Sequence, residues 1–303
     1  MHGKYFASDN LLVYVSQTLF TGGSDRSILV NSKAKASMSL GIVVKGTEGL
    51  ALAADSRVTL QGEQKLPGGH TKPFTINYDN ANKVITFSEE EHAYVGAITF
   101  GEALIGQRTA YSFVPEIEIG LPEKRMKTAE YAADLSSFYL TQWRDRMPDE
   151  DDYQGNGMNF VVVGYDEGEP YGRIFTFNIP HNPESSEQNK GEFGITYGGE
   201  AQIVNRLVKG MDPQLVHLLS QGSEKEASKI WREVEQQGLQ YSFPYEVLPL
   251  QDCLDLAILL VRTTIDFQSL AVGTRGVGGK IEAATVTRTD GVNFVQRKEI
   301  QGE

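Results

Sequence analysis

Cysteine is almost absent from this chain of 303 residues, whose single example is Cys253. One cysteine excludes an intrachain disulfide framework and is consistent with a reducing compartment. Histidine is scarce as well: the five histidines are scattered and share no spacing typical of zinc ligands. We therefore expect neither disulfides nor a metal site.

The sequence also lacks the features by which proteins bind membranes or nucleic acids. The longest apolar run near the start, residues 11–15, is too short for a signal-peptide core or a membrane-spanning helix. Lysine and arginine number 28 against 40 aspartates and glutamates, a formal net charge of −12. A nucleic-acid binder needs a basic face. The sequence predicts a cytoplasmic protein with no membrane and no nucleic-acid partner.

No Gly/Ser-rich or Pro-rich linker divides the chain, so we expect one compact domain, although its length could hold two. Short apolar runs bounded by turn residues predict strands, and a 3.6-residue apolar period predicts helices. Segments rich in glycine, proline and polar residues predict loops over 60–82 and 180–191. The strands are expected over 83–88, 93–98, 158–165, 172–179, 281–288 and 293–297, and the helices over 128–146, 224–237 and 251–270.

The most informative stretch is residues 37–59, SMSLGIVVKGTEGLALAADSRVT. Two apolar runs, 40–44 and 50–54, flank a glycine-bounded turn and predict a buried hairpin. The second run ends in Asp55-Ser56-Arg57, and because strand side chains alternate, Asp55 and Arg57 point to the same face. The residues alone leave two interpretations open: a functional carboxylate at a strand end, or an ordinary core hairpin capped by a surface ion pair.

Together with NKVITF at residues 82–87, this hairpin resembles the first hairpin of proteasome subunits, a branch of the N-terminal-nucleophile hydrolases. The chain looks like a divergent β-type member. The resemblance implies an α+β fold, a four-layer α/β/β/α sandwich of antiparallel sheets, over a domain 37–303. Residues 1–36 would then be an N-terminal extension or a propeptide removed to expose the nucleophile. The alternative is a stable arm that packs on the domain or on a neighbour.

The resemblance also implies the site residues. Counting back from the first strand places the nucleophile at Ser37, where catalytic family members carry a threonine freed by self-cleavage. Because the hairpin turn is about two residues longer than usual in the family, Ser39 stays open as a second register. Asp55 and Lys83 match the family's acid and lysine.

One more residue matches by position. Gly101 occupies a strand-to-helix turn whose backbone amides form the oxyanion hole in the family. The alternative for Gly101 is a close-packed turn without a catalytic role.

The implied chemistry is amide hydrolysis through a covalent intermediate. The Ser37 hydroxyl would attack the scissile carbonyl, with its freed α-amine as general base, because an α-amine titrates near about pH 8. Lys83, as ammonium, would stabilise the alkoxide, and Asp55 would keep Lys83 oriented and charged. Arg57 is expected to brace Asp55 or a nearby loop.

Residues 272–279, VGTRGVGG, form a second glycine-rich segment. They follow a predicted helix and lack the Lys-Ser/Thr ending of a phosphate-binding loop, so no cofactor is expected. The segment resembles the family's loop after its last long helix. Val277 stands where that loop carries serine, Thr274 where it carries aspartate, and Ala36 where glycine usually precedes the nucleophile.

Three functions remain open from the sequence. The first is a proteasome-like, threonine/serine-type endopeptidase that cleaves peptides or unfolded proteins within a homo-oligomeric ring, with an unfoldase partner that the sequence does not identify. The second is a non-catalytic structural subunit of such an assembly. The third is a stand-alone amidohydrolase.

Overall fold

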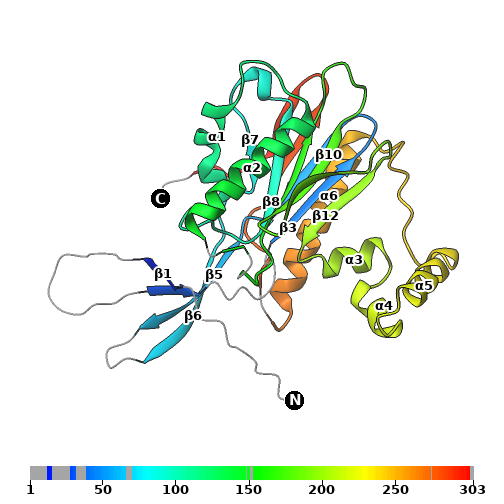
Figure 1. Cartoon of the computed structure of the whole chain (residues 1–303). Helices are drawn as coiled ribbons and strands as arrows, with labels where there is room; N and C mark the ends of the chain where they lie inside the picture. The colour runs from blue at the N-terminus through cyan, green and yellow to red at the C-terminus, as the bar shows by residue number, and fades with distance from the viewer. Residues whose placement is uncertain are drawn as a thin grey trace, which may run out of the picture.

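The computed structural model describes residues 12–15, 28–31, 39–65, 70–147, 149–150, 153–273 and 275–300. Two five-stranded antiparallel sheets lie face to face at its centre (Figure 1). The first sheet has the order β12 (Gly194–Gly199), β3 (Leu40–Lys45), β4 (Leu50–Ala54), β13 (Glu282–Thr287) and β14 (Gly291–Gln296). The second has the order β11 (Asn182–Gln188), β10 (Arg173–Ile179), β9 (Met158–Gly164), β8 (Val95–Gly101) and β7 (Val84–Thr86).

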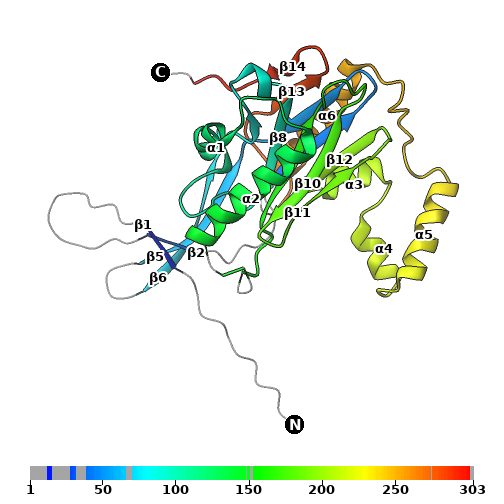
Figure 2. The ribbon, with the colours of Figure 1, turned by 45° about the horizontal axis from the view of Figure 1, so that its top comes forward.

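Helices cover both outer faces, so the expected α/β/β/α sandwich is confirmed (Figure 2). α2 (Thr128–Arg146) and α1 (Val114–Gly120) lie on the second sheet, and α6 (Leu250–Leu270) lies on the first, with α3 (Gln202–Val208) against α6. The short helix η2 (Ala110–Phe113) leads into α1, and η1 (Glu90–His92) joins β7 to β8. Beyond α3, α4 (Pro213–Leu219) and α5 (Glu224–Gln236) extend away from the sheets in both views.

The apolar runs of β3 and β4 are continuous because both faces of these strands are buried. Leu40, Ile42 and Val44 pack toward α6, whereas Val43, Leu50 and Leu52 enter the layer between the two sheets. The strand period of two therefore distributes one apolar run over two separate cores.

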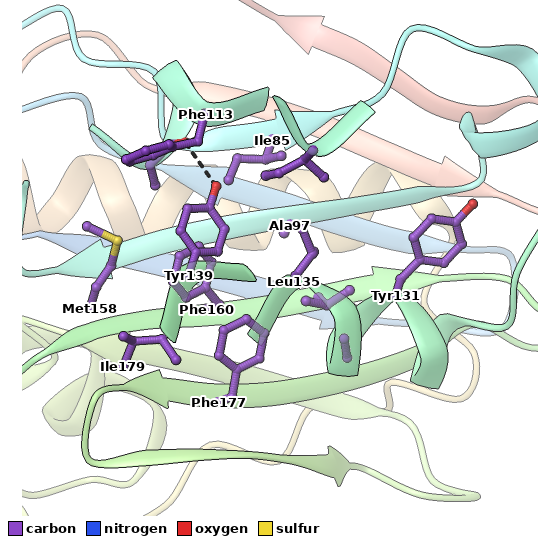
Figure 3. Packing of buried hydrophobic residues seen from close by; sticks show 14 of the residues in the cluster. Ile85, Ala97, Phe113, Tyr131, Leu135, Tyr139, Met158, Phe160, Phe177 and Ile179 are labelled. Carbon is purple, nitrogen blue, oxygen red and sulfur yellow. Dashed lines mark hydrogen bonds between the residues drawn. The ribbon is translucent and has the colours of Figure 1, made fainter. Parts of the chain in front are cut away.

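α2 buries one stripe against the second sheet. Tyr131, Leu135, Tyr139 and Trp143 recur every four residues and are fully or almost fully buried. Figure 3 shows Tyr131, Leu135 and Tyr139 directed toward the sheet, where the Tyr139 ring stacks on Phe160 of β9. The Tyr139 hydroxyl donates to the Ala110 carbonyl at 2.9 Å, which satisfies the polar end of a buried ring.

The loop expected over residues 60–82 is wrong, because most of this segment forms two strands of a third sheet. β5 (Val58–Lys65) and β6 (Thr71–Tyr78) form a hairpin in register from Val58–Tyr78 to Lys65–Thr71, and it points away from the sandwich (Figure 1). Almost every residue of β6 is exposed. Phe74, Ile76 and Tyr78 alternate with polar residues along β6, but the glycines, prolines and polar residues of 60–82 favoured a loop.

The loop expected over residues 180–191 is also wrong, because residues 182–188 form the polar strand β11. Its sequence NPESSEQ has no apolar residue besides proline, yet it pairs with the edge of β10, for example Thr176 with Ser186. Its ladder satisfies backbone groups at the sheet edge rather than burying apolar side chains.

Two strands of the N-terminal extension are described. β1 (Leu12–Val15) pairs with β2 (Ile28–Asn31), and β2 pairs with β5, so the third sheet has the order β1-β2-β5-β6. Whether residues 1–36 are kept as an arm or removed as a propeptide stays a prediction. No helix in the described part of the chain is long and apolar enough to span a membrane.

Candidate active site

The candidate site lies where strand ends from both sheets meet. Ser39 directly precedes β3, Asp55 directly follows β4, and Lys83 directly precedes β7. Antiparallel pairing of β3 with β4 places the start of one strand beside the end of the other, with Gly41 opposite Ala54. Topology alone thus brings Ser39 next to Asp55, although the whole hairpin separates them in sequence.

Asp55 is fully buried and saturated with hydrogen bonds. Its Oδ1 accepts from the Leu40 amide at 2.9 Å and from Lys83 Nζ at 2.7 Å. Its Oδ2 accepts from the amides of Arg57 and Gly278, each at 3.0 Å. A buried carboxylate needs such partners, and these fix its orientation toward Lys83.

Lys83 is the central cation of the site. Its Nζ donates to Asp55 Oδ1 at 2.7 Å and to Ser39 Oγ at 2.8 Å, and its side chain is almost completely buried. Burial lowers the pKa of Lys83, while the neighbouring Asp55 carboxylate opposes that shift. A positive charge is therefore held against a serine hydroxyl, which is the arrangement that stabilises a developing alkoxide.

Ser39 is held by a glycine turn. Its carbonyl accepts from the Glu200 amide at 2.9 Å. Gly199, with φ of +96°, lies so close that a Cβ there would approach the Ser39 carbonyl oxygen to 1.8 Å. Only glycine permits both this conformation and this approach. Ser37, the first register expected from the sequence, lies outside the described residues and stays a prediction.

Gly101 ends β8 and lines the same pocket as Ser39 and Lys83. Its φ is +96°, and a Cβ at this position would lie 2.5 Å from the Gly157 carbonyl oxygen. The close-packed turn, which was the alternative interpretation, is therefore enough to explain why residue 101 is glycine. Because Gly101 also lines the pocket, its role in an oxyanion hole stays a prediction.

Arg57 braces nearby loops, as expected. Its Nε and Nη2 bind the two carboxylate oxygens of Asp79 at 2.6 and 2.7 Å, and Nη1 donates to the Arg275 carbonyl at 3.0 Å. Hydrogen bonding to Asp79 raises the pKa of Arg57, and the same bond lowers the pKa of Asp79. Arg57 thus joins the segment before Lys83, through the bidentate pair with Asp79, to the segment after α6, through the Arg275 carbonyl.

The glycine-rich segment after α6 reaches Asp55 through its main chain. Besides the Gly278 amide bound to Asp55, the Gly278 carbonyl accepts from the Ser56 amide at 3.0 Å. Val277 is buried among the residues between α6 and the first sheet. The side chain at this position thus packs in the core, while the neighbouring amide supports the acid. Thr274 lies outside the described residues.

Sequence reasoning missed Glu282 at the start of β13. This buried carboxylate accepts from the Lys83 amide at 2.8 Å through Oε2. One signal was available: Glu282 is the only charged residue in the apolar run 281–286, IEAATV. Among the described residues, no group of three His, Cys, Asp or Glu side chains could hold a metal ion.

Comparison with solved structures finds two similar proteins. The first is the Anbu (Gly-1) mutant from Hyphomicrobium sp. strain MC1, with a TM-score of 0.50, 14% identity and 86% of each chain covered. The second is Anbu (ancestral beta-subunit) from Yersinia bercovieri, with a TM-score of 0.46 and 14% identity over 84% of this chain and 87% of that one. No protein-family model and no curated protein matches the sequence. At this identity the likeness to the Hyphomicrobium protein shows a shared fold.

Proposed function

We propose that this chain is a proteasome-like peptidase of the N-terminal-nucleophile type, with the Ser39 hydroxyl as nucleophile. The observation that carries the proposal is the contact of Lys83 Nζ with both Ser39 Oγ and Asp55 Oδ1. The fold shared with Anbu supports the proteasome-like part of the proposal. Peptides or unfolded proteins are the proposed substrates.

In the proposed mechanism, cleavage before Ser39 frees its α-amine, which takes the hydroxyl proton as Oγ bonds to the substrate carbonyl carbon. Lys83, as ammonium, stabilises the alkoxide, and the Gly101 amide is the proposed donor to the carbonyl oxygen. Collapse of the tetrahedral intermediate breaks the C–N bond, and the leaving amine takes the proton from the α-ammonium. Water then hydrolyses the acyl ester and restores the Ser39 hydroxyl.

Ser39 is proposed in preference to Ser37 because Ser39 Oγ is the hydroxyl that Lys83 contacts in the described structure. The two serines form a matched pair for the test. Ser39→Ala should abolish peptide hydrolysis, whereas Ser37→Ala changes a residue of the removed segment and should leave it near the wild-type rate. Intact mass should show a mature chain that begins at Ser39.

Other results would overturn this assignment. A mature chain that begins at Ser37, or loss of hydrolysis in Ser37→Ala alone, moves the nucleophile to Ser37. A chain that keeps Met1 and still hydrolyses peptides contradicts the free-amine mechanism. Mass spectrometry after labelling with an electrophilic serine-directed inhibitor identifies the modified residue in either case.

The second candidate is a non-catalytic structural subunit, and the pairing of β2 with β5 favours it. An extension retained by this ladder would keep Ser39 inside the chain and deny it a free amine. This function predicts an intact mass from Met1, no peptide hydrolysis, and a stable assembly.

For both candidates we propose a closed homo-oligomer, the commonest form of soluble assemblies. Light scattering at micromolar concentration tests it: a ring gives a multiple of the chain mass, and a monomer would favour a stand-alone amidohydrolase.

A further inference from the structure

A second buried ion pair lies next to the backbone of Lys83. Glu282 at the start of β13 and Lys298 in the segment after β14 approach to 3.5 Å between Oε1 and Nζ. The exposed fractions of their side chains are 2% and 7%. The proposed mechanism does not use either residue.

Both members of this pair bind the main chain around Lys83. Glu282 Oε2 accepts from the Lys83 amide at 2.8 Å and from the Val84 amide at 3.4 Å. Lys298 Nζ donates to the carbonyl of Ala81, two residues before Lys83. The pair therefore holds the backbone on both sides of the residue whose ammonium contacts Ser39.

A structural role alone gives a weak account of this arrangement. Removing two charges from water is expensive, and apolar residues of similar volume often replace a buried ion pair without loss of stability. Here the charges are retained beside three backbone groups that flank a single functional side chain. Because a misplacement of about 1 Å can lower a catalysed rate about a hundredfold, the support of this backbone has a direct chemical consequence.

We propose that Glu282 and Lys298 are positioning residues of the hydrolase, which hold the Lys83 backbone so that its ammonium reaches Ser39 and Asp55 together. This proposal rests on the proposed function. Neither residue contacts the reacting atoms, and each acts through Lys83.

Glu282 also contributes to the charge balance at Lys83. Burial lowers the pKa of Lys83, and the carboxylates of Asp55 and Glu282 oppose that shift, whereas Arg57 adds to it. The pKa of Lys298 is lowered by burial and raised by Glu282 in the same way. Loss of the Glu282 charge would leave Lys298 as an unneutralised cation near Lys83. The charged groups around Lys83 from all neighbouring segments are Asp55, Arg57, Asp79, Glu282 and Lys298.

The test measures kcat and KM for peptide hydrolysis against pH in wild type, Glu282→Gln and Lys298→Met. Glu282→Gln keeps the volume and one acceptor oxygen but removes the charge. We expect kcat to fall about tenfold or more with KM changed less than about twofold, since substrate contacts are intact. The pH above which Lys83 loses its proton, and with it activity, should move downward.

Two further variants control for folding and for charge. The double variant Glu282→Gln with Lys298→Met removes both charges together, so no unneutralised Lys298 is left near Lys83. Its profile of kcat against pH should therefore shift less than that of Glu282→Gln. Glu187→Gln breaks the distant ion pair with Arg173 and should leave the kcat profile unchanged. Should Glu282→Gln fail to fold, Lys298→Met and the double variant still report kcat against KM.

A second readout does not depend on activity. The Lys83 Nζ resonance, assigned by its loss in Lys83→Met, gives the Lys83 pKa by NMR, and we expect a lower value in Glu282→Gln. An active wild type whose kcat profile and Lys83 pKa are the same in Glu282→Gln overturns the positioning role. An inactive wild type in which Glu282→Gln still shifts the Lys83 pKa overturns the proposed function instead.

Discussion

Two charged clusters in this molecule use similar side chains to different ends. At the site, Lys83 is buried between Asp55 and Ser39. At the start of β10, Arg173 binds both oxygens of Glu187 at 2.8 Å and Asp166 at 2.9 Å. Three N–H groups of Arg173 donate to carboxylates, whereas one donor of Lys83 is directed at a neutral hydroxyl.

Under the proposed function, this difference separates a structural cluster from a reactive one. Hydrogen bonding to Glu187 raises the pKa of Arg173, which fixes its charge at all ordinary pH values. Burial lowers the pKa of Lys83, and its Nζ contacts the Ser39 hydroxyl as well as the Asp55 carboxylate. In the proposed mechanism the Lys83 ammonium stabilises the alkoxide at Ser39, whereas the Arg173 guanidinium binds carboxylates.

The largest expected effect comes from removing the Lys83 charge. Lys83→Met should abolish peptide hydrolysis and self-processing, because the alkoxide loses its nearest positive charge. Arg173→Met, its counterpart in the other cluster, should lower the melting temperature and leave hydrolysis near the wild-type rate. Initial rates and thermal melts of both variants measure the contrast. A Lys83→Met protein that assembles and cleaves peptides normally would end the catalytic interpretation.

The next effect concerns the acid. Asp55→Asn keeps the shape of the side chain and removes the charge that offsets the effect of burial on the pKa of Lys83. We expect the free energy of unfolding to fall by about 3–5 kcal/mol, the range for breaking a buried pair, together with loss of hydrolysis. Urea denaturation measures the first and a peptide assay the second. Unchanged stability would show that solvent reaches the pair.

Gly101→Ala should have a smaller effect on stability. A Cβ there approaches the Gly157 carbonyl to 2.5 Å in a left-handed backbone, and we expect a loss of about 1–3 kcal/mol. Gly168→Ala is the matched control, since Gly168 has φ of +80° and a Cβ there would meet nothing within 4 Å. A fall in kcat for Gly101→Ala beyond that of Gly168→Ala supports the oxyanion role, and equal rates would leave only the close-packed turn.

The smallest expected effect is the pH dependence of stability, which arises at opposite ends of the pH range in the two clusters. The unfolded chain keeps a lysine proton up to about pH 10.4, but folded Lys83 loses it at lower pH. Between these values the unfolded state binds more protons, so the free energy of unfolding rises with pH. Lys83→Met should flatten that alkaline slope in urea titrations.

At Asp166, burial raises the pKa, but hydrogen bonds from Thr128 and Arg173 outweigh it and the net pKa is lowered. The contribution of Asp166 to the free energy of unfolding is therefore fully present at pH values above its pKa in the unfolded chain, about 3.9. It is lost as the pH falls through its pKa in the folded protein. Asp166→Asn should weaken the acid-side fall of the wild type. A wild-type slope retained in Asp166→Asn would assign that fall to other carboxylates.

The sequence predicted those parts of the fold in which burial leaves a pattern. The helix 128–146 was found because its apolar residues follow the period of the buried face. The strands of the first hairpin were found because they are short continuous apolar runs around a glycine-bounded turn. β11 was missed because a polar strand pairs through its backbone without a side-chain signal. β6 was missed because its alternating Phe74, Ile76 and Tyr78 lie in a segment dominated by glycine, proline and polar residues.

The site residues likewise fall into those that the sequence indicated and those that it did not. Asp55 and Lys83 were found through a resemblance of local motifs, and the fold brings them together. The Glu282 carboxylate binds the Lys83 amide across 199 residues, and the Gly278 amide binds the Asp55 carboxylate across 223. Glu282 could be noticed only as a lone charge in an apolar run, and the Gly278 amide carries no local signal, because the partner of each is set by the fold.

The span of these contacts has a consequence for biosynthesis. The bond from Lys298 to Ala81 closes 217 residues, and that from Gly278 to Asp55 closes 223. A ribosome delivers the chain from the N-terminus, and contacts between distant residues form after local ones. The hydrogen bond between Asp55 and the Gly278 amide, and the one between Lys298 and the backbone before Lys83, can therefore form only when nearly the whole polypeptide has been translated. Under the proposed function, a nascent chain would be an incomplete hydrolase, and self-cleavage at residue 39 would be deferred until synthesis is almost finished.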